Sequence, residues 1–148
     1  AYNVIPNEIE IKGTVRCFST KVQASIENQM ENLTSSICSA YGATYEFEYQ
    51  HRYPPTINSA EEVETSLKVM NEISDESMIN TSPSPSMGSE DFAFMLQEKP
   101  GSYIWIGNGD GEGSCMLHNP GYDFNDKILP IGATYWVNMA EEILSPIY

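Results

Sequence analysis

The sequence predicts an α/β fold of the α+β kind, because two different periods of apolar residues follow one another along the chain. Residues 8–17 alternate between apolar and polar side chains, which is typical of a strand with one buried face. Residues 22–41 carry apolar side chains at steps of three and four, the period of one helical face. Alternation returns in residues 43–51, so this part of the chain is predicted as strand, helix, strand.

Capping residues predict where the first helix begins and ends. Thr20 and Gln23 have the spacing of a capping box, in which each side chain bonds the other residue's backbone. Gly42 follows the last apolar position and can adopt the left-handed conformation that ends many helices. We therefore expect the helix to run from about Thr20 to just before Gly42.

The rest of the chain is predicted as three helices, a strand and two loops. Paired prolines in residues 53–58 indicate an extended connector and a domain boundary. Helices are expected to open at Ser59, at Ser89 after a polar loop, and near Pro130. Tyr103-Ile-Trp-Ile106 is apolar on both faces, as in a strand covered on both sides, and a glycine-rich loop follows it.

Composition excludes several classes of partner. The 148 residues include 7 Lys and Arg against 21 Asp and Glu, so the formal net charge is -14. Such a chain offers no basic patch for nucleic acid and is repelled by an anionic membrane. No apolar run is long enough to cross a bilayer. Three scattered cysteines suit no disulfide framework, which favours a reducing compartment, and we expect a cytoplasmic protein.

The chain has two histidines, and they differ in context. His51 continues the apolar face of the strand at 43–51, where a lone histidine usually packs or caps the strand end. His118 lies in a loop after a buried strand, where α/β folds place their sites. The roles of Asp123 and Asp126 have two possible interpretations. Either they orient His118 through its second ring nitrogen, or they are turn and helix-start residues.

The loop 108–114 resembles the first half of a calcium-binding loop, with oxygen-bearing side chains at alternate positions and a glycine sixth. The second half departs from that pattern. Asn119 occupies the twelfth position in place of a bidentate glutamate, and Pro120 blocks an exit helix. A flexible turn is the favoured interpretation.

Five ordered motifs together carry a resemblance to a known family. The chain resembles the C-terminal portion of a metal-dependent amidohydrolase of the group that contains hippurate hydrolase, aminoacylases, carboxypeptidase G and plant indoleacetyl-amino-acid hydrolases. The motifs are Asn3-Val-Ile-Pro6, Gly13-Thr-Val-Arg16, Tyr53-Pro-Pro-Thr-Ile-Asn58, Ser86-Met-Gly-Ser-Glu-Asp-Phe92 and Leu117-His-Asn-Pro-Gly-Tyr-Asp-Phe-Asn-Asp126.

The resemblance implies a piece of a two-domain enzyme. Residues 1–52 correspond to the second half of a ferredoxin-like lid, through which such enzymes are expected to form homodimers. Residues 53–148 correspond to the final α/β segment of the catalytic domain. By this likeness the chain needs a missing N-terminal half, which carries most metal ligands and the general base, so no catalytic residue lies in this chain.

The resemblance also assigns site residues. His118 corresponds to a ligand of a centre of two divalent metal ions (zinc, manganese, cobalt or nickel). Asn3 and Arg16 match residues that hold substrate, and Arg16 offers a fork that grips a carboxylate. Met87, Gly88 and Ser89 shape the pocket before a helix whose N-terminal backbone suits a carboxylate.

The function implied is hydrolysis of the amide bond of N-acyl amino acids or similar small conjugates. If the family resemblance is set aside, the alternative interpretation is a non-catalytic α+β binding or association module. In a ferredoxin-like sheet the first strand lies between the third and the fourth strands. By the resemblance, residues 8–17 match the third strand and residues 43–51 match the fourth. Without that first strand, we expect residues 1–148 alone to lack amidase activity and to associate through open strand edges.

Overall fold

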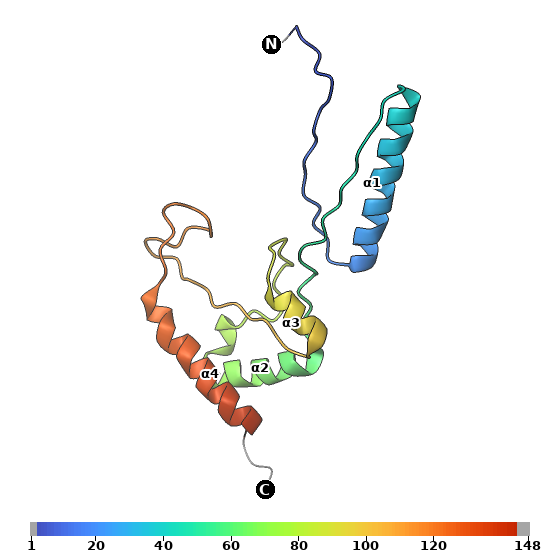
Figure 1. The fold of residues 1–148 in the computed structure, drawn as a ribbon. Helices are drawn as coiled ribbons and strands as arrows, with labels where there is room; N and C mark the ends of the chain where they lie inside the picture. Colours follow the sequence, from blue (N-terminus) through green and yellow to red (C-terminus); the bar gives the residue numbers. More distant parts are fainter. Residues whose placement is uncertain (1–2, 145–148) are drawn as a thin grey trace. The chain divides into compact units, whose positions relative to one another are not determined.

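The computed structural model describes residues 3–144, which divide into two compact units. One unit contains the chain up to Pro55 together with Met87–Ser89, and the other contains Thr56–Ser86 and the chain from Glu90 onward. We describe each unit separately. The helices are α1 (Thr20–Ala40), α2 (Ala60–Ile73), the 3-10 helix η1 (Glu76–Met78), α3 (Phe92–Glu98), the 3-10 helix η2 (Asp126–Ile128) and α4 (Leu129–Leu144) (Figure 1).

The predicted sheet does not form within residues 3–144. Residues 8–17, 43–51 and 103–106 were each expected to be strands, and the structure assigns no strand to any of them. They run as irregular, largely extended segments beside the helices of their own units (Figure 1). The described residues therefore form no sheet, and their regular structure is helical.

The reason is that the extended segments have no ladder partners. Among the described residues, no backbone hydrogen bond joins residues 8–17 to residues 43–51. The apolar face predicted for the first segment is open, with Ile9 78% and Ile11 89% exposed. The segment 103–106 is not covered on both sides either, because Ile104 is half-buried while Trp105 is 63% exposed. A strand needs a neighbour for its N–H and C=O groups, and these segments lack one.

Helix α1 forms close to where the sequence predicts it, with different capping. Its N-cap is Ser19, whose hydroxyl accepts a hydrogen bond from the Val22 amide at 3.4 Å, so the predicted Thr20–Gln23 capping box is wrong by one residue. At the other end Gly42 has φ +65°. Two bonds close a Schellman motif there: Gly42 N to Ser39 O at 3.2 Å and Ala43 N to Cys38 O at 2.9 Å.

In the second unit, α2 packs against α4 around a small core. Val69 on α2 and Tyr135 and Met139 on α4 are buried, and Met70, Ile73 and Ile104 surround them. At the edge of this contact, Lys68 donates to both carboxylate oxygens of Glu142, each at 2.6 Å. The hydrogen bond from Lys68 to Glu142 raises the pKa of Lys68, although the pair is exposed and contributes little to stability.

Side chains, rather than a neighbouring strand, pair with the backbone of the segment 101–103. The Asn58 carboxamide accepts from Tyr103 N at 2.9 Å and donates to Tyr103 O at 3.0 Å. Ser59 N donates to Gly101 O at 2.9 Å, and Ser59 Oγ accepts from Gly101 N at 3.2 Å. Ser59 is the N-cap of α2 as predicted, but its hydroxyl serves Gly101 and makes no capping bond to α2.

A buried chain of hydroxyl groups holds the same segment to the helices. Ser66 is 2% exposed, and its Oγ lies 2.6 Å from Ser102 Oγ. The Tyr135 hydroxyl donates to Ser66 Oγ at 3.1 Å. Because each buried hydroxyl has a partner, this polar cluster orients α2, α4 and the segment 101–103 without the cost of an unsatisfied group.

The described residues bury little apolar surface. Among them, the buried apolar residues are Val69, Ala93, Tyr135 and Met139. Large apolar side chains stay exposed on the helices, among them Trp136 at 66% and Val137 at 57% on α4. A compact protein would cover such faces.

No described helix is long and apolar enough to cross a membrane.

We predict that residues 1–148 expressed alone do not form a stable compact monomer. The exposed apolar faces and unpaired extended segments should make the chain associate with itself or retain loose tertiary packing. Light scattering after size exclusion should show species larger than 16.5 kDa, or near-UV circular dichroism should be weak. A monomer that melts cooperatively would contradict the prediction.

Candidate functional site

His118 lies at the third position of a tight turn. The Asn119 amide donates to the Met116 carbonyl at 3.1 Å and closes the turn. His118 has φ +70°, and it is the only non-glycine among the described residues with a positive φ. This left-handed conformation costs a non-glycine residue about 1–2 kcal/mol, so the surrounding turn must hold it. The imidazole is exposed and makes no hydrogen bond to the described residues.

A second turn follows directly and shares Asn119 with the first. The Tyr122 amide donates to the Asn119 carbonyl at 2.9 Å. The Asn119 side-chain oxygen accepts from the Gly121 amide at 2.8 Å. The residue after His118 therefore makes three hydrogen bonds in the loop that presents the imidazole.

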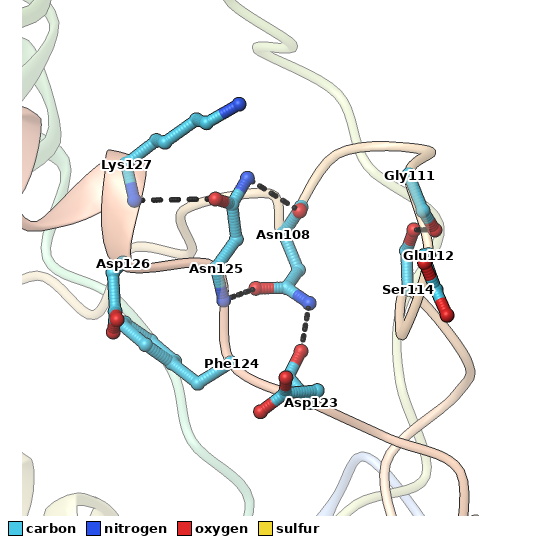
Figure 2. Close-up of a pocket in the computed structure, with 9 residues that line it drawn as sticks. All are labelled: Asn108, Gly111, Glu112, Ser114, Asp123, Phe124, Asn125, Asp126 and Lys127. Atoms are coloured by element: carbon cyan, nitrogen blue, oxygen red, sulfur yellow. Dashed lines mark hydrogen bonds between the residues drawn. The ribbon is translucent and has the colours of Figure 1, made fainter.

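Two asparagines fasten the base of this loop, as Figure 2 shows. The Asn108 side chain accepts from Asn125 N at 2.8 Å and donates to Asp123 O at 2.8 Å. Asn125 Nδ2 donates to Asn108 O at 3.1 Å, and Asn125 Oδ1 accepts from Lys127 N at 3.2 Å at the start of η2. We call Asn108, Gly113, Asp123 and Asn125 the loop neck. It fixes both ends of the segment that carries His118.

Gly113 completes the loop neck because no other residue fits there. It has φ +84°, and a Cβ at this position would lie 2.7 Å from the Asp123 Cβ. Asp123 N also donates to Gly113 O at 2.9 Å, so the two backbones are in direct contact. The sequence indicates a glycine-rich turn here, but it does not show that Asn108 and Asn125, at the two ends of the segment 108–125, hold it closed.

A polar hollow lies at the loop neck. It has a volume of about 370 Å³ and is lined by polar residues that include Glu112, Asp123 and Asp126 (Figure 2). His118 is not among them, and no group of three metal-ligating side chains occurs in the described residues. Both polar atoms of the Asn108 side chain are hydrogen-bonded within the loop neck, which agrees with a structural turn rather than a calcium loop.

The two aspartates near His118 act as turn and helix-start residues. Asp123 contributes its backbone to the loop neck. Asp126 begins η2, behind the N-cap residue Asn125. Neither carboxylate is hydrogen-bonded to His118 in the part of the chain that the structure describes. Of the two interpretations open from the sequence, the structure supports the second.

In the first unit, the structure brings together two sets of residues that the sequence singled out. Arg16 Nη1 donates a short hydrogen bond to the Met87 carbonyl and lies 3.5 Å from Ser89 Oγ. The three residues come from segments more than 70 positions apart in the chain. Asn3 is exposed and makes no hydrogen bond to the described residues, so the structure does not join it to this group.

The predicted helix start at Ser89 is wrong. Helix α3 begins at Phe92, with Asp91 as N-cap and no side-chain cap. The carbonyls of Glu90 and Asp91 accept from Ala93 and Phe94, while the Ser89 hydroxyl faces Arg16. Met87, Gly88 and Ser89 therefore lie in an irregular segment, and the helix N-terminus expected to hold a carboxylate is not at these residues.

His51 is exposed and contacts α1 through an ion pair. Its Nε2 lies 2.9 Å from Glu27 Oε2 on α1, which joins the segment 43–51 to this helix. Its ring also lies 5.0 Å from the ring of Tyr49 within the same segment. The Nε2 atom of His51 is thus engaged by a carboxylate, whereas His118 makes no hydrogen bond to the described residues.

Comparison with known proteins identifies the family. The model of peptidase family M20/M25/M40 matches residues 5–142, nearly the whole chain. The chain belongs to this family. The resemblance drawn from the five motifs is thereby confirmed. Members of the M20 family are hydrolases that generally depend on divalent metals, and membership supports an α/β-type hydrolase, although the described residues form no strand.

Curated relatives align along most of the chain. Thermostable carboxypeptidase 1 of Saccharolobus solfataricus is 33% identical over 88% of this chain and 33% of its own length. IAA-amino acid hydrolase ILR1-like 4 of Arabidopsis thaliana is 32% identical over 97% and 34%. Hippurate hydrolase of Campylobacter jejuni is 30% identical over 97% and 37%. No solved structure matches. The chain thus spans about a third of the length of these M20 relatives.

We predict that Gly113→Ala destabilises the loop neck. The new Cβ meets Asp123, and the alanine must also keep the left-handed backbone conformation of Gly113. Together these two effects should lower the free energy of unfolding by about 2 kcal/mol or more. Gly111→Ala is the matched control, because a Cβ there meets nothing within 4 Å. Denaturant unfolding of the full-length protein should show a lower midpoint for the first variant only. Equal midpoints would show that the loop neck tolerates a side chain.

Proposed function

We propose that the complete protein hydrolyses the amide bond of N-acyl amino acids or similar small conjugates, using two divalent metal ions. The observation that carries this proposal is the family match over residues 5–142. Relatives named hippurate hydrolase, N-acetylcysteine deacetylase and IAA-amino acid hydrolase all align with 97% or more of this chain. The names of these relatives share one substrate class, a small acyl group on an amino acid.

His118 is the residue of this chain that we assign to the metal centre. Its exposed imidazole has no competing hydrogen bond among the described residues and suits zinc, manganese, cobalt or nickel. The described residues hold no group of three ligating side chains, so this donor set fits one ligand of a centre completed by other parts of the protein. When bound, the metal ions polarise the substrate carbonyl and activate water.

Arg16 is the residue that we assign to the substrate carboxylate. Its two described partners, the Met87 carbonyl and the Ser89 hydroxyl, are neutral and both engage Nη1. Lys12 and Lys68 differ, because each is paired with a carboxylate. These partners therefore do not neutralise the positive charge of Arg16. Its Nε and Nη2 donors stay available to bind a carboxylate through two hydrogen bonds. Asn3, Met87, Gly88 and Ser89 complete the proposed substrate-binding set.

The remaining polypeptide of the complete enzyme would cover the open faces of this chain. The relatives are about three times as long as the matched segment, and large apolar side chains such as Trp105 and Trp136 are exposed. We assign residues 1–52 to the second half of a lid through which a homodimer forms, and residues 53–148 to the end of the catalytic domain. Added chain would also supply strand partners for residues 8–17, 43–51 and 103–106.

We predict that His118→Ala in the complete enzyme abolishes amide hydrolysis and lowers bound metal to one ion or less per site. Loss of a ligand removes one bond to the metal and opens its coordination sphere, which weakens metal binding. Metal content by atomic emission and hydrolysis of hippurate are the measurements, and His51→Ala is the control histidine. Full activity with unchanged metal content in His118→Ala would refute the ligand assignment.

We predict that Arg16→Ala raises KM for substrates with a free α-carboxylate by about 10–100-fold, because charged hydrogen bonds are worth roughly 1.5–3 kcal/mol. The same substrate with an amidated carboxylate should lose much less. Lys12→Ala is the matched control, since it removes an exposed cation from the same segment without touching Met87 or Ser89. Equal losses on both substrates would mean that Arg16 only holds Met87 and Ser89 in place.

A further inference from the structure

We propose that Asn119 is a positioning residue that holds His118 in its metal-binding conformation. The proposal rests on the function proposed above, in which His118 is a metal ligand. Asn119 does not itself touch the metal in this assignment. It acts through the turn that it closes and through the following turn, which its side chain holds.

The geometry of Asn119 supports this role. Its amide closes the turn that contains His118, by donating to Met116 O at 3.1 Å. Its side-chain oxygen accepts from Gly121 N at 2.8 Å across Pro120, an arrangement in which an asparagine side chain imitates a backbone turn. Its carbonyl accepts from Tyr122 N at 2.9 Å. Donor and acceptor groups of one residue thus hold both the turn of His118 and the turn after it.

The conformation of His118 makes such support necessary. A histidine at φ +70° is in a region that it leaves unless neighbouring bonds oppose the change. The imidazole is exposed, so packing does not restrain it. Pro120 restricts the backbone of Asn119 but has no N–H to donate, which leaves the Gly121 amide as the donor that the Asn119 side chain captures.

Positioning of this kind is measured as metal affinity. A ligand that occupies its binding conformation for only a fraction of the time binds metal more weakly by that fraction. Loss of residues that orient metal ligands typically costs 10–100-fold in affinity. Because the loop that contains Asn119 is exposed, we expect a loss of metal affinity at the lower end of this range.

The experiment compares five variants of the complete enzyme, of which His118→Ala removes the proposed ligand itself. Asn119→Ala removes the side-chain acceptor, and Asn119→Asp keeps an oxygen at the same position. Gly121→Ala disturbs the same bond from the donor side, because its Cβ would lie 3.3 Å from Asn119 Oδ1. The matched control is Asn80→Ala, since the Asn80 side chain accepts from Ser82 N at 3.0 Å in a similar turn of another loop. Zn²⁺ affinity is measured by chelator competition, and melting temperature reports folding.

We expect Asn119→Ala to weaken Zn²⁺ binding by about 10-fold, with Gly121→Ala also weaker and with Asn119→Asp and Asn80→Ala close to the parent. Equal affinity in Asn119→Ala and Asn80→Ala overturns the inference while leaving the His118 assignment intact. Unchanged affinity in His118→Ala overturns the proposed function itself. If Asn119→Ala does not fold, the Zn²⁺ affinities of Gly121→Ala and Asn119→Asp are compared with that of the parent enzyme. Affinities equal to the parent's in both variants overturn the inference.

Discussion

A backbone amide or carbonyl needs a partner, and this requirement decides which segments of the molecule have regular structure. Helices supply partners from within, so α1, α2 and α4 form from their own residues and need only caps and one covered face. An extended segment depends on a neighbour. Where the neighbour is absent, as for residues 8–17 and 43–51, apolar side chains stay exposed and no ladder forms. The small core of the described chain follows from this difference.

Asparagine side chains replace missing backbone partners at several places in the described chain. Asn58 pairs with both backbone groups of Tyr103, as a neighbouring strand would. Asn108 pairs with the backbone of Asn125 and Asp123 at the loop neck. Asn119 accepts from Gly121 beside His118. A carboxamide carries a donor and an acceptor at one end of a short side chain, which suits it to this substitution. The loop of His118 is therefore ordered by polar contacts rather than by burial.

The sequence predicts the helices well because their signals are local. The apolar stripe of residues 22–41 and the glycine at position 42 locate α1 to within a residue at either end, and Ser59 correctly marks the N-cap of α2. The caps fail where a distant group competes for the same hydroxyl, as Gly101 does for Ser59 and Arg16 does for Ser89. The strand predictions depend on a distant partner in another way, since alternation predicts a strand's two faces but not the presence of its neighbour.

The candidate site residues came from a family resemblance, because no local pattern connects Arg16 with Met87 or marks His118. What the structure adds is how each is held. Arg16 is held by a carbonyl and a hydroxyl, and His118 by the backbone of its turn, so neither residue uses an ion pair for support. His51 and Lys68 differ, because His51 Nε2 and Lys68 Nζ each contact a carboxylate. The neutral partners of Arg16 leave its charge open to the substrate carboxylate proposed for it, and the turn of His118 leaves its ring nitrogens open to the proposed metal.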